Sequence, residues 1–196
     1  MGSIGGLVDT SSSRTPSEVR LRDARTGELD EVAGLLAEVY AVFRRHFPAL
    51  AWESYIGEIV DVRSRLGESE LIVAERAGRL VGTIGLYPDA SRSALERWPQ
   101  GWASIRALGV RAGARRHGVG AALARECLLR AREREAKAIG LHTASHMAAA
   151  TRLYERVGLR RAPELDIEIG EMFAGRSLPP GESWQAQAYR LDLEEV

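Results

Sequence analysis

The sequence lacks the features that mark several specialised classes of protein. Cys127 is the only cysteine, which excludes a disulfide within the chain and a zinc site made of several thiolates. No apolar run approaches the roughly 18 residues needed to cross a bilayer. The first residues lack the basic and apolar regions of a secretory signal. We therefore expect a soluble, cytoplasmic protein with no membrane partner and no metal site.

An excess of charge of either sign is also missing. Lysine plus arginine and aspartate plus glutamate each total 27, so the formal net charge is zero. A neutral chain has no overall attraction to nucleic acid. The basic residues at 125–137 are interleaved with Glu126, Glu133 and Glu135, a pattern typical of a solvated helix face with salt bridges. We expect no nucleic-acid partner.

The length and composition fit one domain. The chain has 196 residues and is 45% hydrophobic, which is enough for a core of its own. Residues 1–17 are rich in Gly, Ser and Thr and offer little apolar surface to offset the entropy of ordering. The sequence therefore predicts a flexible N-terminal tail, 1–17, and a single domain, 18–196.

The hydrophobic pattern predicts an α/β fold of the mixed, α+β kind. Helical spacing of apolar residues predicts helices over Leu29–Phe47, Trp52–Leu66, Gly118–Ala136 and Met147–Val157. Strand patterns cover Val19–Arg22, Glu70–Glu75, Leu80–Tyr87, Ala103–Val110, Ile139–Thr143, Arg160–Ile169 and Trp184–Leu193. Strands that follow one another directly indicate antiparallel pairs, and the β-α-β from Ala103 to Thr143 needs a parallel crossover. A mixed, mostly antiparallel sheet of about seven strands, with helices on both faces, satisfies both.

A basic segment with two glycines lies between the strand that ends at Val110 and the helix expected from Gly118. Free N–H groups at a helix N-terminus attract phosphate oxygens, and glycine lets a ligand approach the backbone closely. Arg115 and Arg116 offer charge-assisted hydrogen bonds. The dinucleotide fingerprint would need glycine where Leu123 stands, and the Gly-Lys-Ser/Thr of a P-loop is absent. The segment is either an ordinary turn with solvated arginines or a phosphate site of another kind.

Two motifs together carry a family resemblance. Arg115-x-x-Gly118-x-Gly120 resembles the first signature of the GNAT family of N-acetyltransferases. Ala150-x-x-Leu153-Tyr154-x-x-x-Gly158-Leu159 resembles its second signature, at the family's usual separation. The resemblance extends from about Val19 to Leu193 and is sharp from Ile105 to Arg161. It implies the GNAT fold, and the local sequence is similar to a bacterial subgroup of the family.

The resemblance implies a site for acetyl-CoA as the acetyl donor. The backbone from Leu108 to Val110 would pair with the pantetheine arm and aim an N–H at the thioester carbonyl, and the loop would surround the pyrophosphate. The implied cofactor-binding residues are Leu108, Gly109, Val110, Arg115, Arg116, His117, Gly118, Val119, Gly120 and Ala121. Arg111 or Arg116 would reach the 3′-phosphate of the adenosine, unless both are simply solvated.

The resemblance also implies catalytic residues. Tyr154 matches the tyrosine that protonates the departing CoA thiolate in many members, although its helical face also fits a core position. His142 lies where some members carry a glutamate and is the candidate base, with a structural histidine as the alternative. His146 follows near the same cleft. Ser104 and Arg106 stand on the strand where relatives often place an acidic residue, so the base stays open.

The expected function is transfer of an acetyl group to a primary amine by direct attack in a ternary complex. A small-molecule amine is favoured over a protein N-terminus or lysine, because many aromatic residues suit a largely apolar pocket. These residues are Tyr40, Phe43, His46, Phe47, Trp52, Tyr55, Tyr87, Trp98 and Trp102, although ordinary core explains several of them. Glu53, Glu58 and Asp89 offer carboxylates to a cation. The alternative is a non-catalytic acyl-CoA-binding sensor, and the strand Trp184–Leu193 offers an edge for a possible homodimer.

Overall fold

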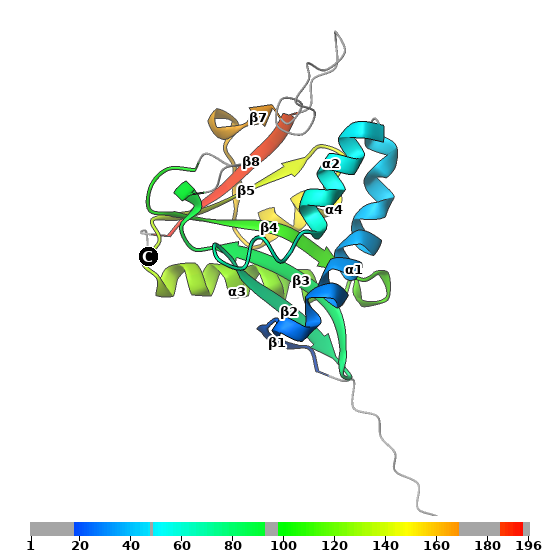
Figure 1. Ribbon diagram of the computed structural model, residues 1–196. Coiled ribbons are helices and arrows are strands. Elements are labelled where there is room, and N and C mark those ends of the chain that lie inside the picture. Colours follow the sequence, from blue (N-terminus) through cyan, green and yellow to red (C-terminus); the bar gives the residue numbers. More distant parts are fainter. Residues whose placement is uncertain (1–17, 48, 93–97, 169–184, 194–196) are drawn as a thin grey trace, which may run out of the picture.

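A computed structural model describes residues 18–47, 49–92, 98–168 and 185–193 of the chain (Figure 1). The expected flexible tail, residues 1–17, lies outside the described residues. The remainder of the expected domain is built around one sheet.

The sheet is mixed and mostly antiparallel, as the sequence predicts. Its eight strands follow the order β1-β2-β3-β4-β5-β8-β6, and β7 also pairs with β8. The strands are β1 (Arg20–Asp23), β2 (Glu70–Arg76), β3 (Arg79–Tyr87), β4 (Trp102–Val110), β5 (Ala138–Ala144), β6 (Arg160–Arg161), β7 (Ile167–Glu168) and β8 (Gln185–Asp192). Only β4 and β5 pair in parallel.

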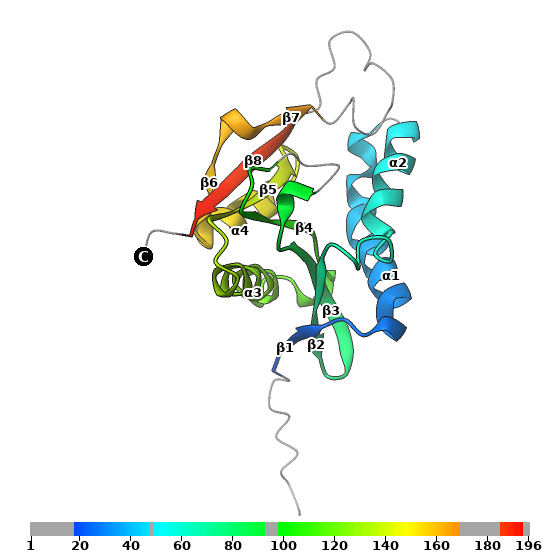
Figure 2. The same ribbon diagram turned by 60° about the vertical axis from the view of Figure 1, so that its left-hand side comes forward.

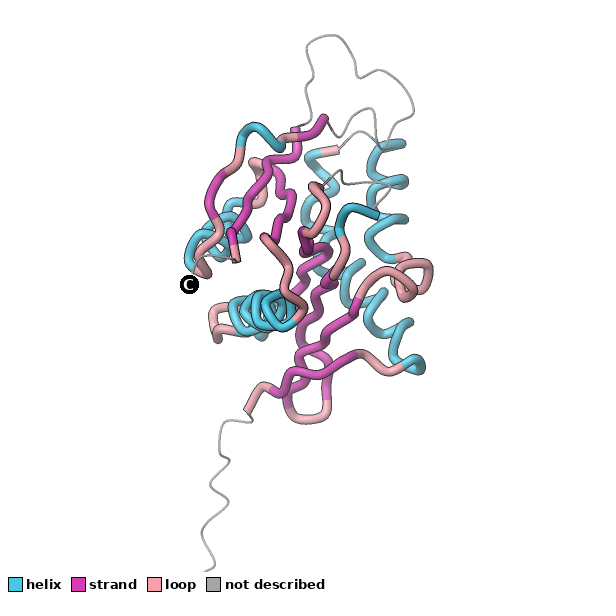
Figure 3. Tube along the Cα trace, turned by 90° about the vertical axis from the view of Figure 1, so that its left-hand side faces the viewer, coloured by secondary structure: helices cyan, strands magenta, loops and turns pink. Residues whose placement is uncertain are grey.

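Helices cover both faces of this sheet (Figures 2 and 3). One face carries α1 (Leu29–Tyr40) and α2 (Ala49–Val60), and the other carries α3 (Val119–Glu133) and α4 (Ala148–Arg156). Each pair of helices closes its own cluster of buried residues against the strands. On α1 the buried Val32, Leu35, Leu36 and Val39 repeat at three and four residues, so a single stripe faces the sheet.

The helix expected over Leu29–Phe47 is shorter than predicted. It ends at Tyr40 and tightens into a 3-10 helix over Ala41–His46, in which no residue is buried. Phe43 is the one apolar residue of this described segment that packs against the core, so the last turns gain less from α-helical geometry, and a tighter 3-10 end is common. The second expected helix likewise ends at Val60 rather than Leu66.

The strand expected over Arg160–Ile169 is wrong as a continuous element. It forms two short strands, β6 and β7, separated by a 3-10 turn at Pro163–Leu165. Proline has no N–H to donate to β8, so pairing stops there. The two pieces bring the number of strands to eight instead of seven.

The far edge of β8 is occupied by the same chain. β8 pairs with β5 on one edge and with β6 and β7 on the other, and the Ala188 N–H donates to Asp166 Oδ1 (2.9 Å). The expectation that this strand offers a free edge to a second subunit is therefore wrong. A homodimer would need another surface.

The parallel strands separate soon after they meet, and this opening positions the site. β4 and β5 pair only from Trp102–Ser104 to Ala138–Gly140. Further along, β4 carries a bulge, because Thr83 lies opposite Gly109 while Gly85 lies opposite Arg106. Ala107 within the bulge has φ of 53°. The bulge bends β4 away from regular pairing at the point where β5 diverges.

Candidate active site

A cavity of about 780 Å³ lies where β4 and β5 separate. Its walls include β4 from Ile105 to Leu108 and β5 from His142 to Ala144, the parts of the strands beyond their pairing. One end of the cavity reaches α1 and α2, and the other reaches the start of α3 and the side of α4. Two ends with different linings therefore share one continuous space.

The start of α3 has the features expected of an anion site. Gly118 is the N-cap, with φ of 79°, and it has no side chain to cap the helix. The first N–H groups of a helix have no partner inside it, so those from Val119 to Ala121 are available to a ligand. Gly118, Val119, Gly120 and Ala121 all line the cavity.

Gly118 and Gly120, the two glycines of the first signature, are required for different structural reasons. A Cβ on Gly118 would meet nothing within 4 Å, so its left-handed backbone is the constraint. A Cβ on Gly120 would lie 2.7 Å from Leu153 Cδ1, so this residue lets α3 and α4 approach each other. The first signature is thus packed against the second.

The arginines of the loop are divided between holding the loop and lining the cavity. Arg115 lines the cavity, but its Nε donates to the Val110 carbonyl (2.9 Å). Arg111 donates to the Leu80 carbonyl (3.1 Å) and pairs with Glu38, away from the cavity lining. Of the two candidates for the 3′-phosphate, Arg116 is the one that lines the cavity.

Two further arginines line this end, and the sequence analysis did not assign them to it. Arg125 on α3 and Arg156 on α4 both reach the cavity lining. Arg125 was interpreted as part of a solvated helix face. It lies four residues after Ala121, and this i, i+4 spacing places it on the same face as the loop.

Two of the expected cofactor-binding residues, Gly109 and His117, do not line the cavity. Gly109 packs against α1, where an added Cβ would lie 3.1 Å from Leu36 Cδ2 and 3.2 Å from Leu35 Cδ2. His117 Nδ1 lies 2.8 Å from the Arg115 carbonyl oxygen. Leu108 and Val110, the neighbours of Gly109 on β4, do line the cavity.

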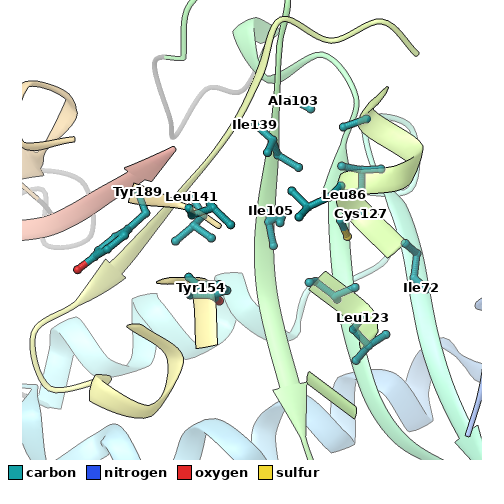
Figure 4. Packing of buried hydrophobic residues seen from close by; sticks show 14 of the residues in the cluster. Ile72, Leu86, Ala103, Ile105, Leu123, Cys127, Ile139, Leu141, Tyr154 and Tyr189 are labelled. Atoms are coloured by element: carbon teal, nitrogen blue, oxygen red, sulfur yellow. The ribbon is translucent and has the colours of Figure 1, made fainter. Parts of the chain in front are cut away.

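Tyr154 on α4 is buried but borders the cavity. It is 7% exposed and packs in the cluster that includes Ile105 and Leu141 (Figure 4). Burial raises its pKa, and the nearby Tyr40 and Cys127 add to this effect. The phenol therefore keeps its proton at neutral pH, the form that a proton donor needs.

Tyr40 is a second tyrosine at the cavity, and its position in a helical stripe had favoured a core role. Its hydroxyl donates to the Leu108 carbonyl across 3.4 Å, so it touches β4 at the bulge. Burial raises its pKa to about 12; Arg65 and Arg106 act in the opposite direction, and Glu58 raises it further. Tyr40 is thus both a core residue and part of the cavity wall.

His142 lines the cavity from β5 and is tied to the fold. Its ring stacks on Trp98 (4.5 Å between centroids), and Nε2 lies 2.9 Å from the Leu165 carbonyl oxygen. Because a carbonyl oxygen only accepts, Nε2 carries the proton and Nδ1 is the basic nitrogen of the neutral ring. These two contacts fix the orientation of the ring.

His146 belongs to an aromatic group beside the cavity. It stacks on His46 (4.3 Å) and packs against Phe43 and Phe47. Burial lowers its pKa to about 4, and the nearby His46 and Arg45 contribute. A histidine ring that stays neutral can pack among other aromatic rings without the cost of burying a charge.

The aromatic residues proposed for the acceptor side separate into two groups. Tyr40, Phe43, Phe47 and Tyr55 line the cavity and contact one another. Trp98 and Trp102 stack together (5.8 Å) over a different cluster, near Ala162 and Ala188. Of the three proposed carboxylates, Glu58 lines the cavity, whereas Glu53 pairs with Arg44 at the surface.

The sheet opens between two parallel strands, and this opening leads to the N-terminus of a helix. Together, this fold and this site define an acyltransferase. A sequence model of the acetyltransferase (GNAT) family matches residues 36–159. The chain therefore belongs to the acetyltransferase (GNAT) family, and it is an N-acetyltransferase.

Solved structures share the fold over most of the chain. A GNAT-family acetyltransferase from Staphylococcus aureus is 17% identical, with a TM-score of 0.62 over 90% of this chain and 100% of that chain. A putative acetyltransferase from Salmonella typhimurium with its cofactor acetyl-CoA is 17% identical, with a TM-score of 0.60 over 91% and 95%. The PaiA N-acetyltransferase of Thermoplasma acidophilum in complex with coenzyme A is 13% identical, with a TM-score of 0.63 over 89% and 99%. A comparison with curated protein sequences finds no match.

Within the described ranges, no group of three or more His, Cys, Asp or Glu side chains is placed to hold a metal ion. No helix in the same part of the chain is long and apolar enough to cross a membrane.

Proposed function

We propose that the protein transfers the acetyl group of acetyl-CoA to the primary amine of a small molecule, by direct attack while both substrates are bound. The observation that carries this proposal is the continuous cavity, which joins the anion site at α3 to an aromatic end through the opening beside the β4 bulge. Two substrates can meet in such a space without a covalent enzyme intermediate.

The donor end fits acetyl-CoA. The open N–H groups from Val119 to Ala121 would hold the pyrophosphate, with Arg116 close by. Arg125 and Arg156 add positive charge around the phosphates. The Salmonella typhimurium and Thermoplasma acidophilum proteins of the same fold hold acetyl-CoA and coenzyme A, which supports this donor.

The chemistry needs a hydrogen-bond donor, a base and an acid. The amine nitrogen forms a bond to the acetyl carbon while the carbon–sulfur bond breaks. An N–H of β4 near Leu108 would stabilise the negative charge that develops on the thioester oxygen. The nitrogen gives a proton to the base, and the leaving thiolate takes one from Tyr154.

His142 remains the proposed base. Its fixed ring leaves Nδ1 as the nitrogen that can accept a proton from the amine, directly or through water. The hydrogen bond of His142 to Leu165 equally suits a structural role. The variant His142→Gln distinguishes a catalytic base from a structural residue, and its affinity for acetyl-CoA serves as an internal control. A base predicts lost turnover with unchanged affinity for acetyl-CoA.

The test of the function is thiol release from acetyl-CoA with a panel of amines, run beside a direct measurement of acetyl-CoA binding. The panel covers arylalkylamines, polyamines, aminoglycosides, amino acids and peptide N-termini. We expect acetyl-CoA binding together with thiol release that depends on an amine. Binding without thiol release from every amine would instead favour a non-catalytic acyl-CoA sensor.

A further inference from the structure

The charges that line the cavity are unevenly distributed. Glu58 on α2 is the only carboxylate residue in the lining contributed by the described part of the chain. All other charged residues in that lining are arginines, namely Arg106, Arg115, Arg116, Arg125 and Arg156. A cationic acceptor that enters the cavity therefore meets one carboxylate.

Glu58 is anchored through one of its two carboxylate oxygens. Its Oε1 accepts from Arg106 Nη2 at 2.6 Å, and the two side chains are 23% and 11% exposed. The Arg106 guanidinium lies over the Tyr87 ring, 5.5 Å from its centroid. The strand β4 and the helix α2 thus meet through this ion pair beside the cavity.

The second oxygen of Glu58 lacks a hydrogen bond. Among the described residues no donor reaches Oε2, and it is shielded from solvent. An unsatisfied carboxylate oxygen in such a place is unfavourable. A small rotation toward the cavity would let the N–H of a bound ammonium satisfy it.

An aromatic wall stands next to Glu58. We use this name for Tyr40, Phe43, Phe47 and Tyr55, whose neighbouring centroids lie 4.7 to 6.2 Å apart. Such rings favour an apolar or aromatic ligand and also attract a cation placed over their faces. Tyr40 in this wall also contacts the β4 bulge through Leu108, which connects the wall to the proposed reacting centre.

We infer that the acceptor is an arylalkylamine, whose single ammonium first binds at Glu58 with its apolar body against the aromatic wall. The ammonium has no lone pair, so it gives one proton to the base before the neutral nitrogen attacks the acetyl carbon. This inference rests on the proposed function and narrows its substrate class. Polyamines and aminoglycosides would bring further ammonium groups to a cavity whose other charges are arginines. Amino acids would place a carboxylate beside Glu58, and peptides would bury backbone groups among rings.

The first test ranks acceptors with the unmodified protein. The measured quantity is kcat/KM for 2-phenylethylamine, spermidine, kanamycin, phenylalanine and a short peptide, followed by thiol release. We expect 2-phenylethylamine to lead by roughly tenfold or more, the value of one hydrogen-bonded charge contact. Preference for spermidine, kanamycin or phenylalanine would overturn the inference and leave the proposed function standing, whereas preference for the peptide would overturn the small-molecule acceptor as well. Failure of every amine to release thiol would overturn the proposed function as well.

The second test separates an ammonium contact from a structural role of Glu58. In Glu58→Gln the amide keeps the shape and can still accept from Arg106, but its charge is gone. We expect KM for 2-phenylethylamine to rise roughly ten- to hundredfold. Inhibition by 2-phenylethanol, which has a hydroxyl in place of the ammonium, should keep its Ki, and KM for acetyl-CoA should not change.

Glu53→Gln is the matched control. It removes a carboxylate from the same helix, but Glu53 is exposed and pairs with Arg44 outside the cavity lining. All its constants should equal those of the unmodified protein. If Glu58→Gln changes KM for 2-phenylethylamine and Ki for 2-phenylethanol by the same factor, or changes neither, the inference is contradicted. If Glu58→Gln does not fold, the acceptor ranking decides alone.

Discussion

The hydroxyl of Tyr154 is the single group in the proposed mechanism that a one-atom change can remove. The ring is packed among Ile105 and Leu141, so its apolar body is explained by the core. The residue lines the cavity, and the raised pKa of its hydroxyl keeps that group protonated. The proposed mechanism thus gives the residue a structural role through its ring and a chemical role through its hydroxyl.

Tyr154→Phe should therefore reduce turnover without weakening the binding of acetyl-CoA. General acids contribute typically 10²- to 10⁴-fold, so we expect kcat to fall by roughly 10²-fold. Tyr189→Phe is a control, since Tyr189 lies in the same buried cluster but faces Arg161 instead of the cavity. Equal kcat values for Tyr154→Phe and the unmodified protein would assign Tyr154 to packing alone.

At the scale of elements, the start of α3 decides how the donor is held. Gly118 combines a left-handed backbone with open space around it, and the helix behind it has no side-chain cap. A charge placed there would act on the phosphates directly.

Gly118→Glu should weaken acetyl-CoA binding more than Gly118→Ala does. Both variants carry the strain of a side chain at φ of 79°, and only glutamate adds a negative charge next to the phosphates. We expect a difference of roughly tenfold in Kd, measured by calorimetry at low salt and reduced at high salt. Identical affinities of the two variants for acetyl-CoA would show that the phosphates do not bind at this loop.

β5 offers a test of packing away from the cavity charges. A Cβ on Gly140 would lie 2.5 Å from the Trp98 ring, which cannot yield like a flexible side chain. Trp98 itself stacks on Trp102 and His142. The glycine is therefore required by the close approach of a rigid ring.

Gly140→Ala should lower the free energy of unfolding by about 1–3 kcal/mol, the usual effect of overpacking. Gly34→Ala should have the opposite sign, because Gly34 lies on α1 with nothing within 4 Å of an added Cβ. There alanine is favoured by about 0.5–1 kcal/mol in a helix. Urea unfolding of both variants measures the two effects, and stabilisation by Gly140→Ala would contradict the contact with Trp98.

At the scale of the whole molecule, one ionic group links the first strand to the rest of the sheet. Arg22 on β1 lies 2.7 Å from both Glu28 and Glu75, which joins β1, the 3-10 turn at Thr26–Glu28 and β2. The Arg22 side chain, and then the Arg25 N–H, lower the pKa of Glu28 to about 2. The carboxylate is therefore more acidic in the folded state than in the unfolded chain.

This difference predicts how stability depends on pH. A lowered pKa in the folded state stabilises it at pH values above the unfolded pKa of about 4.3, and the contribution disappears as the pH falls toward 2. Glu28→Gln should lower the free energy of unfolding at pH 7 by about 1 kcal/mol and progressively less below pH 4. Glu68→Gln, an exposed carboxylate, serves as control. A penalty that is the same at pH 7 and pH 3 would contradict the ion-pair origin.

Much of the fold follows from local pattern. The hairpin between β2 and β3 turns at Ala77 and Gly78, both with positive φ as the favoured two-residue turn requires. α3 begins next to the expected Gly118, because glycine suits the left-handed N-cap. At other places the expected elements differ from those of the structure. α1 ends when its residues leave the core at Tyr40, and Pro163 divides the expected strand into β6 and β7.

The sequence by itself determined the family, the order of the elements and the position of the donor loop. These depend on short motifs and on residues at fixed spacing along one helix or turn. Only the tertiary structure decided which charges share the cavity. Glu58 and Arg106 are 48 positions apart and meet because α2 packs on α1, which itself packs on β4, and His142 is fixed by Leu165 from a distant turn. Long-range packing creates such contacts, so they cannot be predicted from the spacing of residues along the chain. The sequence therefore left the acceptor open, and the proposal for it rests on contacts that only the fold creates.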